Sequence, residues 1–173
     1  MEPENIFDCI RSSCRQVADK AASVRISYDR IPVYAASLPL DKIITPQLDS
    51  DCHFLGHQEN TVNFLMTLNA INFGSGYFPY LRKRPGMSGY LTLASSLKDA
   101  YEIQGPFSAK HLTEISVEES TRIFNQDPGN IIARELMQRF SVALNDLGRY
   151  VLDRFNGSFT NMVESARFSA ASL

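Results

Sequence analysis

The sequence predicts an all-α protein, an irregular multi-helix domain with helices of unequal length, on three observations. Apolar residues recur at intervals of three and four along several segments, which is the spacing of one face of a helix. Ser and Asp residues precede these segments at positions typical of helix N-caps. No convincing pair of strands is found. We expect residues 1–173 to form a single helical domain.

Composition and charge exclude several classes of protein. The formal net charge of −2 argues against a general binder of phosphate backbones, so we expect no direct nucleic-acid binding. The chain has 3 cysteines and no CxxC pair, which suits a reducing compartment, and we expect a cytoplasmic location. The N-terminus is acidic and no run approaches 18 apolar residues, so we expect neither a signal peptide nor a membrane segment.

The first part of the chain is predicted to hold two helical pieces and a long connection. Residues 3–23 carry apolar side chains at helical spacing. Residues 24–29 are short and β-branched, so they form an extended connector or a minor strand. Residues 31–38 form a single helical piece, and residues 40–57 a connection with at most one helical turn.

Residues typical of helix starts recur from residue 59 onward. Residues 59–73 form a strongly apolar helix, and residues 90–101 form another with Ser88 as its N-cap. The last long helix carries an extended apolar side and is expected to stop at Gly157. Further starts are expected at Ser108, at Ser116 with Glu119 as a capping box, at Asp127 followed by Pro128, and at Ser158.

Two asparagines near the end of the first of these helices are the leading candidates for a ligand site. The helix over residues 59–73 is apolar on both sides, so we expect it to be central, with Asn69 and Asn72 at or near buried positions. A buried unpaired amide costs about 1–3 kcal/mol, so each needs a partner. Either they tie the following loop to the helix, or they present an amide to a heterocyclic ligand, since Asn offers a donor and an acceptor in one plane.

Aromatic side chains surround the Gly-Ser-Gly turn that follows, at residues 74–76. The glycines allow a sharp turn and a close approach of a ligand to the backbone. Tyr77, Phe78 and Tyr80 provide a platform on which a planar base could stack. Phe73, on the helix face of Asn69 and Asn72, is a further candidate. The alternative is that these rings only fill the core.

A basic run, residues 82–84, lies just beyond the aromatic residues. It is either a solvated loop or a contact to a phosphate or carboxylate, in which Arg82 and Lys83 would supply the charge. Ser88, at the start of the next helix, could add backbone N–H donors to such a site.

Other kinds of site are not supported. Asp51, Cys52, His53 and His57 have a spacing similar to that of a metal cluster, but they do not form a complete ligand set. No nucleophile elbow, P-loop or dinucleotide fingerprint occurs. We therefore expect no metal, and the residues assign no catalytic group.

The run NAINFGSGYFPYLRKRPGMSGY, residues 69–90, resembles the queuosine salvage family. The resemblance extends to DCHFLG, GPFSA, VRISYDRIPVYAASLP and LGRYVLDRFNGSFTNMVESARFSAASL. It implies an all-helical fold similar to DNA glycosylases and hydrolysis of the N-ribosidic bond of queuosine 5′-phosphate, which releases queuine for tRNA, with no cofactor. It also implies substrate-binding roles for the candidates above and for Tyr90.

This sequence differs from the family in two ways, and these differences leave several functions open. Family members continue beyond the point that matches Leu173, and the catalytic carboxylate is expected in that part, so we expect a domain incomplete at its C-terminus. Asn69 stands where the family usually has Asp. The chain is then a weakly active or inactive form of the enzyme, or a binding module without chemistry. A nucleic-acid binder that uses residues 82–84, and a homodimer formed through the last helix, also stay open.

Overall fold

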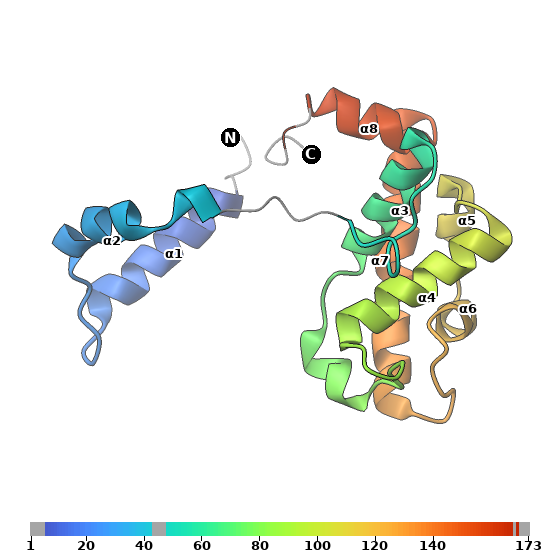
Figure 1. Ribbon diagram of the computed structural model, residues 1–173, viewed down its shortest axis with the longest axis horizontal. Helices are drawn as coiled ribbons and strands as arrows, with labels where there is room; N and C mark the ends of the chain where they lie inside the picture. Colours follow the sequence, from blue (N-terminus) through green and yellow to red (C-terminus); the bar gives the residue numbers. More distant parts are fainter. Residues whose placement is uncertain (1–5, 43–47, 168, 170–173) are drawn as a thin grey trace. The chain divides into compact units, whose positions relative to one another are not determined.

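The computed structural model describes residues 6–42, 48–167 and 169, and the regular elements of these residues are all helices (Figure 1). No strand occurs in these ranges, so the predicted all-α class is confirmed. None of the helices described is long and apolar enough to cross a bilayer. The chain divides into two compact units, Met1–Pro46 and Gln47–Leu173. That the whole chain forms one domain stays a prediction.

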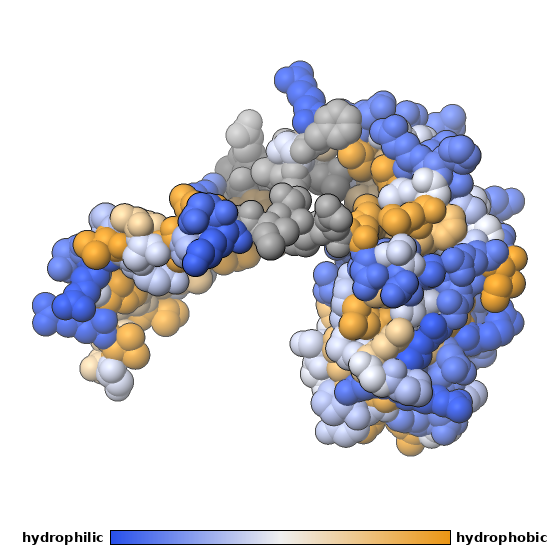
Figure 2. Space-filling view, in the orientation of Figure 1, coloured by the Kyte–Doolittle hydropathy of each residue, from blue (hydrophilic) through white to orange (hydrophobic). Residues whose placement is uncertain are grey.

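The first unit contains two helices and no buried residue in its described part. The prediction of helices near residues 3–23 and 31–38 is confirmed, while residues 3–5 lie outside the described residues. Apolar side chains such as Ile10 and Val17 are therefore exposed within this unit, and Figure 2 shows apolar patches on its surface. The elements are α1 (Ile6–Lys20), η1 (Tyr28–Arg30), α2 (Ile31–Ser37) and η2 (Leu40–Lys42).

The second unit holds the remaining helices and the hydrophobic core. Its longest helix, α7 (Ile131–Phe155), packs against the α-helices α3, α5, α6 and α8 and against the 3-10 helix η3. The elements are α3 (Gln58–Ala70), η3 (Ser75–Tyr80), α4 (Gly89–Gln104), α5 (Ala109–Glu114), α6 (Val117–Ile123), α7 (Ile131–Phe155) and α8 (Phe159–Ser165).

Serine caps set the starts of several helices as predicted. Ser88, Ser108 and Ser158 each accept a hydrogen bond from the backbone N–H three residues later. The capping box at Ser116 is present only in part. Its hydroxyl accepts from the Glu119 N–H, but the Glu119 carboxylate lies 3.0 Å from His111 Nε2.

The predicted start of α7 at Asp127 and Pro128 is wrong. The Asp127 carboxylate accepts from the Gly129 N–H and so closes a tight turn. Asn130 is the N-cap, because its side chain accepts from the Ala133 N–H at 3.1 Å. The helix therefore begins three residues later than the sequence signal indicates.

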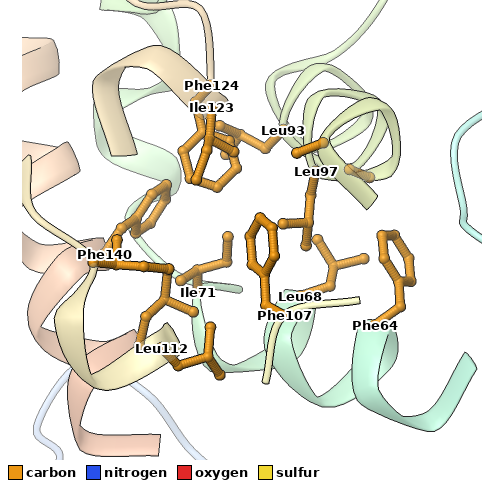
Figure 3. Packing of buried hydrophobic residues seen from close by; sticks show 14 of the residues in the cluster. Phe64, Leu68, Ile71, Leu93, Leu97, Phe107, Leu112, Ile123, Phe124 and Phe140 are labelled. Carbon is orange, nitrogen blue, oxygen red and sulfur yellow. The ribbon is translucent and has the colours of Figure 1, made fainter. Parts of the chain in front are cut away.

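The core lies along the apolar side of α7. Leu136, Met137, Phe140 and Leu144 have no exposed surface. Figure 3 shows the Phe140 side chain among residues contributed by α3, α4 and α6. Ile132, which the sequence places on the same apolar side, is 41% exposed, whereas Ala133 in the same first turn has no exposed surface. The core of the second unit thus forms around the apolar side of α7.

Candidate functional site

Asn69 and Asn72 are exposed, so the expectation that they lie buried is wrong. Helix α3 buries Phe64 and Leu68 and ends at Ala70, before Asn72. The Asn69 amide donates to the Leu65 carbonyl one turn earlier, at 2.8 Å. Among the described residues the Asn72 side chain has no hydrogen-bond partner. Its amide edge is therefore available to a ligand.

Phe73 and Tyr77 follow these asparagines in the chain and are anchored on α7. Phe73 is 40% exposed, and its ring meets Phe140 edge to face at a centroid separation of 5.3 Å. The Tyr77 hydroxyl donates to Glu135 at 2.7 Å. Gly74, with φ of +79°, lets this turn approach α7 so closely that a Cβ there would lie 2.6 Å from Leu136. The two rings are thus held in position, with Phe73 exposed and Tyr77 half-buried.

Two residues of α7 join this site, and the sequence analysis missed both. Arg139 donates to the same Glu135 oxygen at 2.7 Å, and its guanidinium lies 6.0 Å from the centre of the Tyr77 ring. The only sequence signal was a Glu–Arg pair at i, i+4, which is common on exposed helix faces. We call the whole set the amide–aromatic strip: Asn69, Asn72, Phe73, Tyr77, Glu135 and Arg139.

The hydrogen bond from Arg139, and then that from Tyr77, hold the pKa of Glu135 below its usual range. A lowered pKa in the folded state gives stability that is present above the unfolded pKa and is lost as pH falls through the folded one. We expect Arg139→Gln to raise the pKa of Glu135, measured by NMR titration of the side-chain carboxyl. Arg134→Gln, which removes a partner of Glu118 instead, is the control. An unchanged Glu135 titration in Arg139→Gln would show that the pair does not persist in solution.

Phe78, Ser88 and Tyr90 gather at the start of α4. The half-buried Phe78 ring packs so closely on Gly89 that a Cβ there would lie 2.5 Å from it. The Ser88 hydroxyl accepts from the Leu91 N–H, so it serves the helix cap. The Tyr90 hydroxyl lies 3.0 Å from His53 Nε2, and burial raises the pKa of Tyr90. Of these three, Phe78 and Tyr90 are partly buried and pack against the hydrophobic core.

The His53 segment is tied together locally and does not form a metal site. Asp49 accepts from the Asp51 N–H and from the Cys52 thiol, and these bonds hold the pKa of Asp49 below its usual range. Burial, followed by the hydrogen bond to Asp49, raises the pKa of the Cys52 thiol. Within residues 6–42 and 48–167, no group of three His, Cys, Asp or Glu side chains is placed to hold a metal ion.

The basic loop, residues 81–87, is fixed by polar side chains from other elements. Gln126, which is 5% exposed, accepts from the Arg82 N–H at 2.9 Å and donates to the Arg82 carbonyl at 3.2 Å. The Arg84 guanidinium is bound by Asp99 and Ser96. The side chains of Arg82 and Lys83 are exposed and have no partner among the described residues. The two exposed cations thus lie on a loop whose backbone is held by hydrogen bonds to Gln126.

The sequence-predicted residues therefore fall into two groups. Asn69, Asn72, Phe73 and Tyr77 belong to the amide–aromatic strip on α3, η3 and α7, whereas Arg82 and Lys83 lie on a loop held by Gln126. No hydrogen bond or ion pair within the described ranges joins the two groups. The strip can offer amide edges and ring faces to a planar heterocycle, and the loop can offer charge to an anion.

Comparison with known proteins agrees with the family resemblance found in the sequence. A family model described as queuosine salvage protein matches residues 52–173. The queuosine 5′-phosphate N-glycosylase/hydrolase of Sphaerobacter thermophilus is 27% identical over 168 residues, which cover 95% of this chain and 51% of the relative. The protein of the same name from Mus musculus is 25% identical over 182 aligned positions, with 94% and 51% coverage. The chain spans about half the length of the curated relatives it matches.

Proposed function

Because this chain belongs to the queuosine salvage protein family, we propose that it carries the nucleotide-binding part of a queuosine 5′-phosphate N-glycosylase. Both curated relatives bear that name. The substrate would be queuosine 5′-phosphate, and the product would be the base queuine. The observation that carries the proposal is the accessible amide of Asn72 beside two anchored aromatic rings.

The amide–aromatic strip suits a planar deazaguanine base. The Asn72 amide can donate to one ring atom and accept from its neighbour, as an amide does at the edge of a nucleobase. The exposed Phe73 ring and the half-buried Tyr77 ring would supply stacking surface, which is worth about 1–3 kcal/mol per base. Phe78 packs η3 against Gly89 of α4, and the Tyr90 hydroxyl joins α4 to His53. Recognition of the base thus rests on α3, η3 and α7.

The phosphate of the nucleotide is assigned to the other group of residues. Arg82 and Lys83 are cations without a competing partner among the described residues. A charge-assisted hydrogen bond to a phosphate oxygen is about twice as strong as a neutral one. Ser88 caps α4, whose first free N–H groups carry partial positive charge.

Hydrolysis breaks the bond between the ribose C1′ and the base through an oxocarbenium-like transition state, in which a carboxylate activates the attacking water. Glu135, the carboxylate that belongs to the strip, is engaged by Arg139 and Tyr77, and its pKa is lowered. A weakly basic carboxylate with both partners in place is a poor general base. We therefore place the catalytic carboxylate in the part of the family length that this chain does not span.

A binding module without chemistry is the second candidate function. Asn69, where the family resemblance leads us to expect Asp, donates to the Leu65 carbonyl, which a carboxylate could not do. The strip of this chain therefore lacks one negative charge. Binding would persist in such a module, and hydrolysis would not.

The proposal is tested by binding and hydrolysis assays on the 173-residue chain. Queuine and queuosine 5′-phosphate should both bind, measured by calorimetry, and release of queuine should be far slower than in a full-length relative. If neither compound binds, the proposed function fails. If the chain releases queuine as fast as a full-length relative, the placement of the catalytic carboxylate fails.

We expect Asn72→Ala to weaken queuine binding by about tenfold, because one amide–base hydrogen-bond pair is worth about 1–1.5 kcal/mol. Asn161→Ala, another exposed asparagine on α8, is the matched control and should bind as the wild type does. Equal affinity in the two variants would remove Asn72 from the site.

A further inference from the structure

We infer that the Glu135 carboxylate and the Tyr77 ring form a receptor for the positive charge of an organic ammonium group, and that Arg139 competes with the ligand for this receptor. In queuine the charge is that of the protonated amine on the substituent of the deazaguanine ring. The inference rests on the proposed function for the identity of the ligand, but not for the cation site itself. It makes Glu135 a residue that determines specificity.

The carboxylate and the ring already hold one cation, which belongs to the protein. The Arg139 guanidinium donates to Glu135 Oε1 at 2.7 Å and lies 6.0 Å from the centre of the Tyr77 ring. A carboxylate beside the face of an aromatic ring is a favourable environment for an ammonium or guanidinium ion, through a charge-assisted hydrogen bond and a cation–π contact. The position of Arg139 thus shows that the two groups together are complementary to positive charge.

One oxygen of the Glu135 carboxylate remains available. The Tyr77 hydroxyl and the Arg139 guanidinium both donate to Oε1, and no group among the described residues donates to Oε2. An ionised carboxylate accepts hydrogen bonds through both oxygens. The lowered pKa of Glu135, caused first by Arg139, keeps this side chain ionised at neutral pH. A ligand ammonium group therefore finds a charged acceptor at Oε2.

Arg139 is held weakly enough for a ligand to displace it. The side chains of Glu135 and Arg139 are both more than half exposed, and an ion pair in such a position contributes little to stability. Arg84 provides a contrast, because its side chain is 34% exposed and donates to both Asp99 and Ser96. Arg139 can thus leave the Tyr77 ring when a ligand cation arrives, at the loss of one exposed ion pair.

The charge of the amide–aromatic strip assigns this role to Glu135. Glu135 is the only carboxylate among the six residues of the strip, since position 69 is a neutral amide that donates to the Leu65 carbonyl. The substituent of queuine carries a secondary alkylamine, and alkylamines are protonated at neutral pH. Guanine has the same planar edge without this amine. The ligand class that fits the strip is therefore a planar base with a cationic arm.

The test measures, by calorimetry, the affinities for queuine and for 7-deazaguanine, which lacks the amine. We expect Glu135→Gln to lose about 3- to 10-fold in affinity for queuine, because the charge of the acceptor is removed. Arg139→Gln should gain about 2- to 5-fold, because the competing cation is removed. Glu118→Gln and Arg134→Gln, which break another exposed ion pair, are the matched controls and should bind queuine as the wild type does.

The opposite signs of the two effects distinguish a cation receptor from a structural ion pair. If the pair between Glu135 and Arg139 only stabilises α7, both substitutions should weaken binding of both ligands to a similar extent. If the pair forms the receptor, the affinity for 7-deazaguanine should be the same in the wild type and in both variants.

A second arm uses benzylammonium and does not depend on the proposed function. In NMR spectra of the side-chain carboxyl groups, benzylammonium should shift the resonance of Glu135, and neutral benzyl alcohol should not. If queuine does not bind but this shift occurs, the proposed function fails and the cation site stands. The inference is overturned if benzylammonium leaves Glu135 unchanged, if Glu135→Gln keeps the wild-type affinity for queuine, or if Arg139→Gln binds queuine more weakly than the wild type.

Discussion

Replacing Gly148 with alanine is expected to lower the free energy of unfolding by about 2–4 kcal/mol, despite the better helix propensity of alanine. Gly148 is where α5 crosses α7 most closely. A Cβ there would lie 2.6 Å from the Ala109 carbonyl oxygen and 2.8 Å from the Thr113 nitrogen. Both are backbone atoms, so no change of rotamer relieves the overlap, and the two helices must separate.

Separation of these helices also breaks a second set of contacts. Asn145, on the same side of α7, donates to the Leu112 carbonyl at 2.7 Å and to the Ile115 carbonyl at 3.1 Å. These bonds satisfy the C-terminal end of α5. Their loss adds to the overlap, since each hydrogen bond contributes about 0.5–1.5 kcal/mol.

Urea denaturation followed by far-UV circular dichroism measures the Gly148 effect. Gly76→Ala is the matched control, because a Cβ at Gly76 meets nothing within 4 Å, and it should change stability by at most about 0.5 kcal/mol. A Gly148→Ala protein as stable as Gly76→Ala would show that α5 and α7 do not pack this closely.

Phe140→Ala is expected to lower the free energy of unfolding by about 3–5 kcal/mol, the range for removing a buried aromatic ring. Phe140 has no exposed surface and contacts Phe73 and Phe124 edge to face, at centroid separations of 5.3 and 5.5 Å. Since the Phe73 ring rests on Phe140, its loss should also weaken queuine binding wherever the variant remains folded.

The same denaturation measurement distinguishes the loss of the buried Phe140 ring from a general effect of substitutions in α7. Val142→Ala alters an apolar residue of α7 that is 53% exposed, so it should change stability by well under about 1 kcal/mol. Phe140→Leu retains most of the buried volume and should lie between the two. If Phe140→Ala is no less stable than Val142→Ala, the position of Phe140 in the core is wrong.

The positions of the helices were largely predictable, because capping is a local interaction. Ser88, Ser108 and Ser158 act as N-caps through a backbone N–H three residues away. The start of α7 was mispredicted because Asp127 and Asn130 are both good caps. Asn130 is selected in part by a contact distant in sequence, since its amide also donates to the Tyr80 carbonyl.

Burial at the candidate site was not predictable from periodicity. The pattern of α3 is apolar on both sides, but the helix ends at Ala70, so Asn72 and Phe73 leave its axis. Glu135 and Arg139 reach the strip only because Gly74 lets the turn approach Leu136. Such contacts join residues about 60 positions apart, and neither helical spacing nor a local motif encodes them.

By itself, the sequence determined the all-α class, most helix starts and the family, because these depend on interactions between near neighbours and on a long continuous motif. The tertiary structure alone decided which polar groups remain available. Within the described residues, helix packing pairs Arg84 with Asp99 but leaves Asn72, Arg82 and Lys83 without a side-chain partner. The reason is physical, since a polar group binds a ligand only where folding has not already satisfied it.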